Sequence, residues 1–197
     1  MGLAGRLVEA ARIARNAAID LRHGGLLGTN HLSRGSEYSN SDYRALERIF
    51  AGRIRPGDVL VDVGCGYGRV LNHWLRRAPE HRIVGIELDA RVAEATRRRL
   101  APQARVEVVT GDASAALPED GTLFFLFHPF FGADVLARFR DRLAARPPAD
   151  PPLRVLYYNP QDIEVFRADG RWDVELVDIG GAGAAPFDGL AVISARG

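Results

Sequence analysis

The chain has 197 residues, of which 47% are hydrophobic and 26% are charged, and its formal net charge is +1. Such a chain is long enough to form one well-buried globular domain and short for two. The balanced charge provides no overall field that would favour nucleic acid or an acidic surface as the partner. The sequence contains no lysine, which excludes a P-loop lysine, a lysine Schiff base and a lysine general base.

The single cysteine, Cys65, cannot form an internal disulfide, and no group of cysteines and histidines has the spacing of a zinc site. No apolar run approaches the roughly 20 residues that span a bilayer. The N-terminal stretch also lacks the uncharged core of a secretory signal. We therefore expect a cytoplasmic protein with no metal ion and no membrane partner.

The first predicted element is a helix over residues 3–22, where apolar residues recur at three- and four-residue steps before the glycines at 24–25. Such a helix would pack on its own domain or on a second subunit, so a homodimer is possible. Its mostly alanine apolar face argues against a membrane-surface helix. The polar segment 24–40 predicts a loop, and Ser41 is the predicted N-cap of a short helix over 42–52.

From residue 59 onwards, predicted strands and helices alternate. The strands cover 59–63, 82–88, 106–110, 122–128, 153–158, 172–179 and 190–195, and the helices cover 68–77, 90–100, 133–145 and 161–168. Alternation predicts parallel crossovers with helices on both faces of one sheet. The last two strands have no helix between them, so they must run antiparallel. The expected fold class is therefore α/β: a Rossmann-like, seven-stranded, mostly parallel sheet with a terminal antiparallel hairpin, preceded by N-terminal helices.

The stretch VLVDVGCGYGRVL places Gly64, Gly66 and Gly68 at alternating positions just after a strand that carries Asp62. In open parallel sheets, ligands bind beyond the carboxyl ends of the strands, where glycine lets the backbone approach a ligand closely. The dinucleotide-binding fingerprint G-x-G-x-x-G would require its third glycine at Arg69, so that fingerprint fails by one residue.

The order acid-x-Gly-x-Gly-x-Gly resembles the first motif of the class I S-adenosylmethionine-dependent methyltransferases, and the likeness extends over residues 38–196. The terminal antiparallel hairpin also matches the sheet of that family. In the family, an acid after the second strand holds the ribose hydroxyls, and Glu87 stands in that place with Leu88 beside it. An aspartate after the third strand approaches the adenine, which the resemblance assigns to Asp112 together with Ala113.

The resemblance implies S-adenosylmethionine as the cofactor. Its carboxylate would meet backbone N–H groups at the start of the helix that follows the glycines, and Asp62 would accept a hydrogen bond from its ammonium group. Cys65 belongs to the same cofactor-binding loop and is interpreted as a small filler rather than a nucleophile. Residues 1–40 are expected to supply a helix and a loop over the cofactor, with Tyr38 as a contact, and 41–197 the methyltransferase domain.

The stretch LFFLFHPFFG carries the candidate chemistry. Pro129 ends the strand and places His128 at the mouth of the crevice, and a histidine can take a proton from a hydroxyl near neutral pH. His128 is thus the candidate catalytic base, with a structural or substrate-orienting role as the alternative. Amino-directed family members carry Asn or Asp and two prolines here, so amine methylation is in doubt. Asn159, Phe130 and Tyr158 are the candidate acceptor-binding residues.

These observations predict methyl transfer from S-adenosylmethionine to a hydroxyl or amine group of a small molecule. A protein methyltransferase of the lysine-directed type is the alternative, because some such relatives share the Gly-x-Gly-x-Gly-Arg-Val loop. A cofactor-binding scaffold without turnover is a third. The near-zero net charge and the lack of an appended RNA-binding module argue against nucleic acid. The triplet Arg97-Arg98-Arg99 is interpreted as a solvated helix face.

Overall fold

The computed structural model describes residues 3–25, 27, 30–31, 37–38, 41–180 and 189–196, and for residues 3, 4, 9, 30, 31, 37 and 38 it describes the backbone alone. Its helices are α1 (Leu3–Arg22), α2 (Tyr43–Phe50), α3 (Arg69–Arg77), α4 (Ala90–Leu100), α5 (Ala133–Ala144) and α6 (Glu164–Arg167). Its strands are β1 (Asn30–His31), β2 (Glu37–Tyr38), β3 (Leu60–Val63), β4 (Ile83–Glu87), β5 (Val106–Thr110), β6 (Leu123–Phe127), β7 (Arg154–Tyr158), β8 (Trp172–Asp178) and β9 (Gly189–Ala195).

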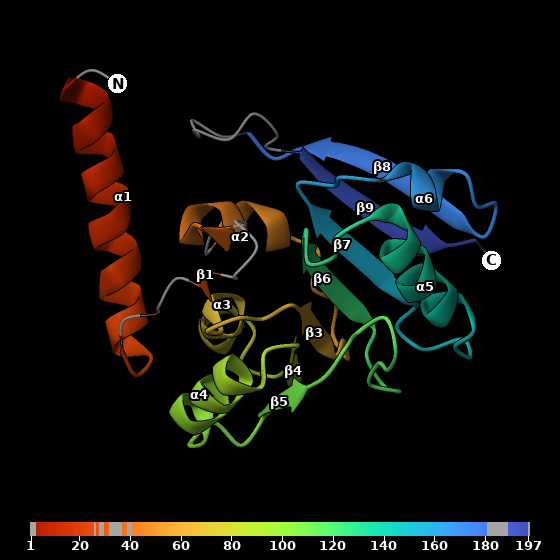
Figure 1. Cartoon of the computed structure of the whole chain (residues 1–197), viewed down its shortest axis with the longest axis horizontal. Coiled ribbons are helices and arrows are strands. Elements are labelled where there is room, and N and C mark those ends of the chain that lie inside the picture. Colours follow the sequence, from red (N-terminus) through yellow and green to blue (C-terminus); the bar gives the residue numbers. More distant parts are fainter. Residues whose placement is uncertain are drawn as a thin grey trace.

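Seven of these strands form one sheet in the order β5-β4-β3-β6-β7-β9-β8 (Figure 1). The strands from β5 to β7 in this order are parallel, whereas β9 runs antiparallel to both β7 and β8. The predicted fold class, including the terminal antiparallel hairpin, is confirmed. Strands β3 and β6 lie near the centre, where every residue of β3 is buried and the continuous apolar run LFFLF of β6 is typical of a strand covered on both faces.

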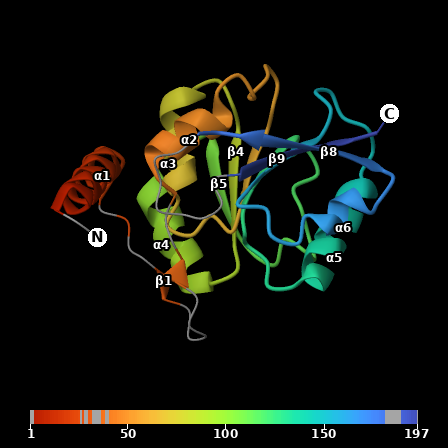
Figure 2. The same ribbon diagram turned by 90° about the horizontal axis from the view of Figure 1, so that it is seen from above.

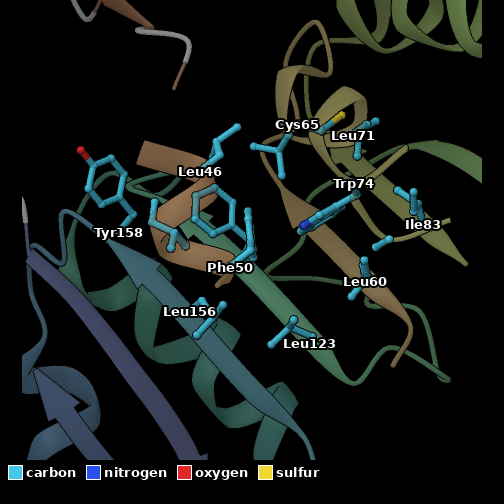
Figure 3. Close-up of a cluster of buried hydrophobic side chains, with 14 of the residues drawn as sticks. Leu46, Phe50, Leu60, Cys65, Leu71, Trp74, Ile83, Leu123, Leu156 and Tyr158 are labelled. Carbon is cyan, nitrogen blue, oxygen red and sulfur yellow. The ribbon is translucent and has the colours of Figure 1, made fainter. Parts of the chain in front are cut away.

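Helices cover both faces of the sheet (Figure 2), and buried apolar side chains form a separate core on each face. On one face, Phe50 of α2 lies with its ring centroid 5.2 Å from those of Trp74 on α3 and Phe125 on β6, and Figure 3 shows Phe50 near the centre of this cluster. On the other face, Phe139 of α5 packs against Phe124 of β6. The two-faced burial holds the strand ends, and the segments that follow them, in fixed positions.

Helix α1 lies outside α2 and α3 (Figure 2). It contacts them through its polar face, since Asp20 accepts a hydrogen bond from Tyr43 of α2 and pairs with Arg69 of α3. Asn16 and Asp20 are 4% and 1% exposed, whereas Leu7 and Leu21 are 63% and 59% exposed. One of the two sequence-based alternatives was that the apolar stripe of α1 packs on its own domain. The exposure of these leucines shows that it does not. Instead, the orientation follows from two buried hydrogen bonds that Tyr43 of α2 donates, from its N–H to Asn16 and from its hydroxyl to Asp20. None of the helices within the described ranges is both long and apolar enough to span a bilayer.

Two local predictions near the start of the chain were wrong. The N-cap of α2 is Asp42 rather than Ser41, because the extended backbone at Asp42 lets its side chain accept the Arg44 N–H at 2.7 Å. Within the segment expected to be a loop, β1 and β2 pair antiparallel, with Asn30 opposite Tyr38. Two-residue strands carry too little alternation to be found by pattern.

Candidate functional site

The carboxyl ends of the four central strands form one edge of the sheet. Val63, at the end of β3, pairs in register with Ile86 on β4 and with Leu126 on β6, while Phe127 pairs with Tyr158 on β7. Segments far apart in sequence therefore follow these strands into a shared space. They are residues 64–68, here called the glycine loop, Glu87 with Leu88, His128 with Pro129, and Asn159 with Pro160.

The glycine loop needs glycine at all three positions, because Gly64, Gly66 and Gly68 have φ angles of 78°, 52° and 82°. The N–H of Gly64 donates to the Ile86 carbonyl at 2.8 Å, which ties the loop to β4. A Cβ atom on Gly64 would stand 3.0 Å from Cβ of Pro129, whereas one on Gly66 would meet nothing within 4 Å. There is therefore free space on the Cβ side of Gly66, whose N–H and carbonyl groups bond to Glu87 and Thr96.

Cys65 lies on the inner side of the loop and is 6% exposed. A Cβ atom on Gly85 would stand 2.7 Å from its sulfur, so the thiol occupies the space left by the missing side chain on β4. Burial raises the pKa of Cys65, and the nearby carboxylates of Asp62 and Glu87 raise it further. The thiol therefore stays protonated near neutral pH, which disfavours a nucleophilic role.

The Glu87 carboxylate joins the end of β4 to the glycine loop. Its Oε2 accepts the Gly66 N–H at 2.9 Å, and its Oε1 accepts the Asp89 N–H at 2.9 Å. A carboxylate offers about four lone-pair positions, so both oxygens retain the capacity to accept further donors. The next residue, Leu88, is 73% exposed, which is unusual for a leucine that directly follows a buried strand.

Asp62 is the buried acid of the site, with 3% of its surface exposed. Burial raises the pKa of its carboxyl well above the usual value, and the negative charge of Glu87 adds to this effect. Among the described residues, no hydrogen bond reaches this carboxylate. A buried carboxylate without donors is costly, so a cationic or N–H-bearing ligand group at this position would relieve the cost.

The remaining predicted cofactor residues are Asp112, Ala113 and Tyr38. Asp112 is exposed and caps the turn after β5, since its Oδ1 accepts the Ser114 N–H at 2.7 Å. Ala113 is buried against the core on the α5 side of the sheet. Tyr38 ends β2, and its side chain lies outside the part of the chain that the structure describes.

His128 and Asn159 end the neighbouring strands β6 and β7 in the same unusual backbone state. Their φ angles are 45° and 51°, although each precedes a proline. Positive φ is costly for a residue with a side chain, and such strain is concentrated at functional sites. The Asn159 Oδ1 is buried without a hydrogen-bond partner among the described residues. Because Phe127 and Tyr158 pair in register, His128 and Asn159 follow their strands side by side at the carboxyl edge.

The His128 imidazole is held from the side of β7. Its Nδ1 lies 3.3 Å from the hydroxyl oxygen of Tyr157. Burial lowers the pKa of His128, and the carboxylate of Asp162 partly opposes that shift. The ring is therefore mainly neutral at neutral pH and has one nitrogen that can accept a proton.

Phe130 and Tyr158 lie in the core rather than on an open surface. Each is 8% exposed, and their ring centroids lie 5.1 Å from that of Phe139 and 4.9 Å from that of Phe127, respectively. The neighbouring Phe131, by contrast, is 58% exposed. Aromatic residues at strand ends thus fill the core here, with Phe131 as the exception.

One link between the N-terminal helix and the glycine loop was missed by sequence reasoning. Arg69, which follows the loop, forms a 2.6 Å ion pair with Asp20 of α1, and their side chains are 12% and 2% exposed. Tyr43 also donates its hydroxyl to Asp20 at 2.7 Å. An acid near the end of α1 gave no local signal, because its partner lies 49 residues away.

A second link runs through Arg99 of α4. Its guanidinium donates to the Tyr67 carbonyl in the glycine loop at 2.7 Å and to the His23 carbonyl after α1 at 2.6 Å. The prediction that all three arginines of this triplet form a solvated face is therefore wrong for Arg99, while the Arg98 side chain is 75% exposed. The third arginine follows the 3.6-residue period onto the face of α4 that meets the loop.

Residues 60–147 match the family model described as a methyltransferase domain. The match runs from the first residue of β3 to just beyond α5, so it includes the glycine loop, Glu87 and His128. Residues 60–147 are therefore similar to a methyltransferase domain, which agrees with the resemblance to class I S-adenosylmethionine-dependent methyltransferases. A comparison with curated protein sequences finds no match.

Solved structures of methyltransferases share the fold. A methyltransferase from Pyrococcus furiosus has 16% identity and a TM-score of 0.65, over 96% of this chain and 98% of that one. An RNA methyltransferase from Salinibacter ruber, in complex with S-adenosyl-L-homocysteine, has 22% identity and a TM-score of 0.57, over 80% and 93%. The O-methyltransferase NcsB1 from neocarzinostatin biosynthesis, in complex with S-adenosylmethionine and 2-hydroxy-5-methyl naphthoic acid, has 16% identity and a TM-score of 0.58, over 71% and 49%.

These likenesses lie under 25% identity and therefore concern the fold. The chain spans about half of the length of NcsB1 and of two further matched structures, at 49% to 55%. The ligands in the NcsB1 and Salinibacter ruber structures agree with the cofactor expected from the sequence.

Proposed function

We propose that this protein transfers the methyl group of S-adenosylmethionine to a hydroxyl or amine group of a small molecule, with a hydroxyl favoured. The single observation that carries the cofactor assignment is the buried Asp62 carboxylate, which has no hydrogen-bond donor among the described residues and a raised pKa. A carboxylate in that state is expected where a ligand supplies the missing positive charge or donor.

The residues around Asp62 suit the chemical groups of the cofactor. The free space beside Gly66 would admit its carboxylate, and the backbone N–H groups at the start of α3 would bind it. Glu87 would accept from its ribose hydroxyls, and the exposed Leu88 would cover an apolar face of its adenine. When bound, S-adenosylmethionine supplies a methyl group already activated by a sulfonium, so alignment of the acceptor accounts for much of the catalysis.

The polar pair His128 and Asn159 supports the acceptor assignment. The neutral imidazole of His128 can accept a hydroxyl proton as the acceptor oxygen becomes a nucleophile. The Oδ1 of Asn159, which has no hydrogen-bond partner in the described part of the chain, can accept a hydrogen bond from the acceptor. NcsB1, a neighbour in fold, was crystallised with a hydroxylated small molecule, and the RNA methyltransferase of Salinibacter ruber is a neighbour in the same sense.

Calorimetric titration with S-adenosylmethionine and S-adenosylhomocysteine tests the cofactor site. We expect micromolar binding to the native protein and loss of binding in Asp62→Ala and in Glu87→Gln. Asp120→Asn is the matched control, because this exposed carboxylate pairs with Arg82 and should not affect binding. Native affinity in both site variants would remove the basis for the assignment.

A screen for S-adenosylhomocysteine formation tests the acceptor class. The panel contains phenols, hydroxy acids, primary amines, a lysine-containing peptide and a structured RNA. Turnover with phenols or hydroxy acids is the expected result, and turnover confined to peptide or RNA would overturn the small-molecule assignment. Cofactor binding without turnover on any acceptor would indicate a scaffold.

A further inference from the structure

The hydroxyl group of Tyr157 stands between two partners at the carboxyl edge of the sheet. Its oxygen lies 2.8 Å from the main-chain carbonyl of Gln161 and 3.3 Å from Nδ1 of His128. Tyr157 is itself 1% exposed and belongs to β7, next to the strand that His128 ends. The tyrosine is therefore fixed by the core and reaches the candidate base with its only polar group.

The Tyr157 hydroxyl has one hydrogen atom to donate, and this decides which nitrogen of His128 carries the proton. A carbonyl oxygen can only accept, so the single hydroxyl hydrogen of Tyr157 is donated to Gln161. The hydroxyl oxygen can then only accept from His128, and Nδ1 must be the donor. A neutral imidazole has one protonated nitrogen, so Nε2 of His128 retains its lone pair.

We propose that Tyr157 is a positioning residue that holds neutral His128 in the tautomer with the proton on Nδ1, so that Nε2 faces the methyl acceptor as the proton-accepting atom. This inference rests on the proposed function. As the acceptor oxygen attacks the methyl carbon, its hydroxyl proton moves to Nε2. A carbon–oxygen bond forms, the carbon–sulfur bond breaks with its electron pair left on sulfur, and His128 ends as an imidazolium that later releases the proton to water.

The backbone around His128 supports the same role. His128 is held at a φ of 45° by the chain on both sides, and Pro129 packs against the glycine loop, 3.0 Å from where a Cβ atom on Gly64 would stand. The main chain thus fixes the position of the His128 side chain, and the Tyr157 hydroxyl fixes the orientation of its imidazole ring. Asp162, at a φ of 55°, lies in the turn that supplies the Gln161 carbonyl.

The test reads the tautomer directly and needs no acceptor. Long-range proton–nitrogen correlation spectra of isotopically labelled protein distinguish protonated from unprotonated ring nitrogens, and His128→Gln assigns one set of signals among the five histidines. In the native protein at pH 8, we expect Nδ1 protonated and Nε2 unprotonated. A native spectrum with Nε2 protonated overturns the proposal without any variant.

Two variants complete the test. Tyr157→Phe keeps the buried ring and removes the hydroxyl, so the His128 signals should move to a mixture of tautomers. Gln161→Ala is the matched control, because it removes a side chain and keeps the carbonyl that accepts from Tyr157. An unchanged tautomer in Tyr157→Phe overturns the proposal. If Tyr157→Phe fails to fold, the native spectrum still decides.

Titration of the same samples with S-adenosylmethionine separates this inference from the proposed function. If the protein binds S-adenosylmethionine but the tautomer prediction fails, only the positioning role of Tyr157 is rejected. If the native protein does not bind S-adenosylmethionine, the proposed function is rejected, whichever tautomer is found. With an acceptor from the screen, Tyr157→Phe should lower kcat roughly tenfold to hundredfold, within the range of about 10² to 10⁴ that general-base catalysis contributes, while KM for S-adenosylmethionine is unchanged.

Discussion

Two buried aspartates stand at opposite ends of β3, four positions apart, and they have opposite surroundings. Asp58, before the strand, is 2% exposed and accepts two hydrogen bonds from Arg154, at 2.8 and 2.6 Å, and one from Thr122 at 2.9 Å. Asp62, within the strand, is 3% exposed and has no donor among the described residues. Burial is nearly equal, so the difference lies in the partners.

The comparison separates a carboxylate with a structural role from one for which we propose a ligand-binding role. At the amino edge of the sheet, Asp58 and Arg154 satisfy each other and join β3 to β7 across the fold. At the carboxyl edge, Asp62 is left with the repulsion of Glu87, which raises its pKa. A protein keeps such a costly group where a ligand completes it. The two edges of this sheet therefore differ in their buried acids: the one at the amino edge has donors, and the one at the carboxyl edge has none among the described residues.

The largest expected effect comes from breaking the satisfied pair. Asp58→Ala leaves the Arg154 guanidinium buried without its partner, and removal of one member of a buried ion pair costs about 3–5 kcal/mol. Urea unfolding followed by circular dichroism measures the loss. Asp120→Ala, which breaks an exposed pair with Arg82, should cost less than about 1 kcal/mol. Equal losses in the two variants would contradict the structural role of Asp58.

The second effect concerns the other carboxylate and appears in binding. Asp62→Asn keeps the shape of the side chain and removes its charge, so the affinity for S-adenosylmethionine should fall by roughly a hundredfold, which corresponds to about 3 kcal/mol. Calorimetry measures the affinity. The same titration on a stable Asp58 variant, such as Asp58→Asn if it folds, should give native affinity. If the two variants lose affinity alike, the proposed division of roles fails.

The third effect is on stability and depends on pH. Because the pKa of Asp62 is raised above 3.8 in the folded state, the folded protein binds a proton there that the unfolded chain has lost, and this favours folding at low pH. The contribution is lost as the pH rises from 3.8 through the raised pKa. Asp62→Asn should therefore match the native protein near pH 3.5 and exceed its stability at pH 7, by on the order of 1–2 kcal/mol.

Urea unfolding of both proteins from pH 3.5 to 8 measures this difference. The buried His73, whose pKa is lowered to about 4 by burial, destabilises both proteins as the pH falls and cancels when they are compared. A stability gain in Asp62→Asn that does not change with pH would show that ionisation of Asp62 is not its cause.

The smallest effect tests whether the carboxyl edge is open. Gly66→Ala adds a methyl group that meets nothing within 4 Å, at a φ of 52°, so strain alone should lower stability by about 1–2 kcal/mol. Gly85→Ala would place its methyl group 2.7 Å from the Cys65 sulfur and should cost more, because overpacking adds to the loss. Thermal unfolding compares the two. A larger loss in Gly66→Ala would mean that the space beside Gly66 is filled.

The sequence by itself determined the main elements of the sheet and the place of the glycine loop. The continuous apolar run of β6, the alternation of strands and helices and the three glycines after Asp62 are local signals, and each follows from the geometry of a short segment. They were sufficient to predict the fold class and to name candidate positions for cofactor-binding residues. The N-cap at Asp42 was missed because it depends on a single side-chain hydrogen bond, and the pairing of β1 with β2 was missed because two-residue strands carry too little alternation.

Only the tertiary structure decided which polar groups meet. The pair Asp58 and Arg154 joins residues 96 positions apart, and Tyr157 reaches His128 because β6 and β7 are neighbours in register. Asp20 turns α1 so that its polar face meets Arg69 and its apolar stripe does not. A buried charge or hydroxyl is placed by partners that are distant in sequence, and no local pattern records them, since hydrogen bonding is satisfied only once the strands are assembled.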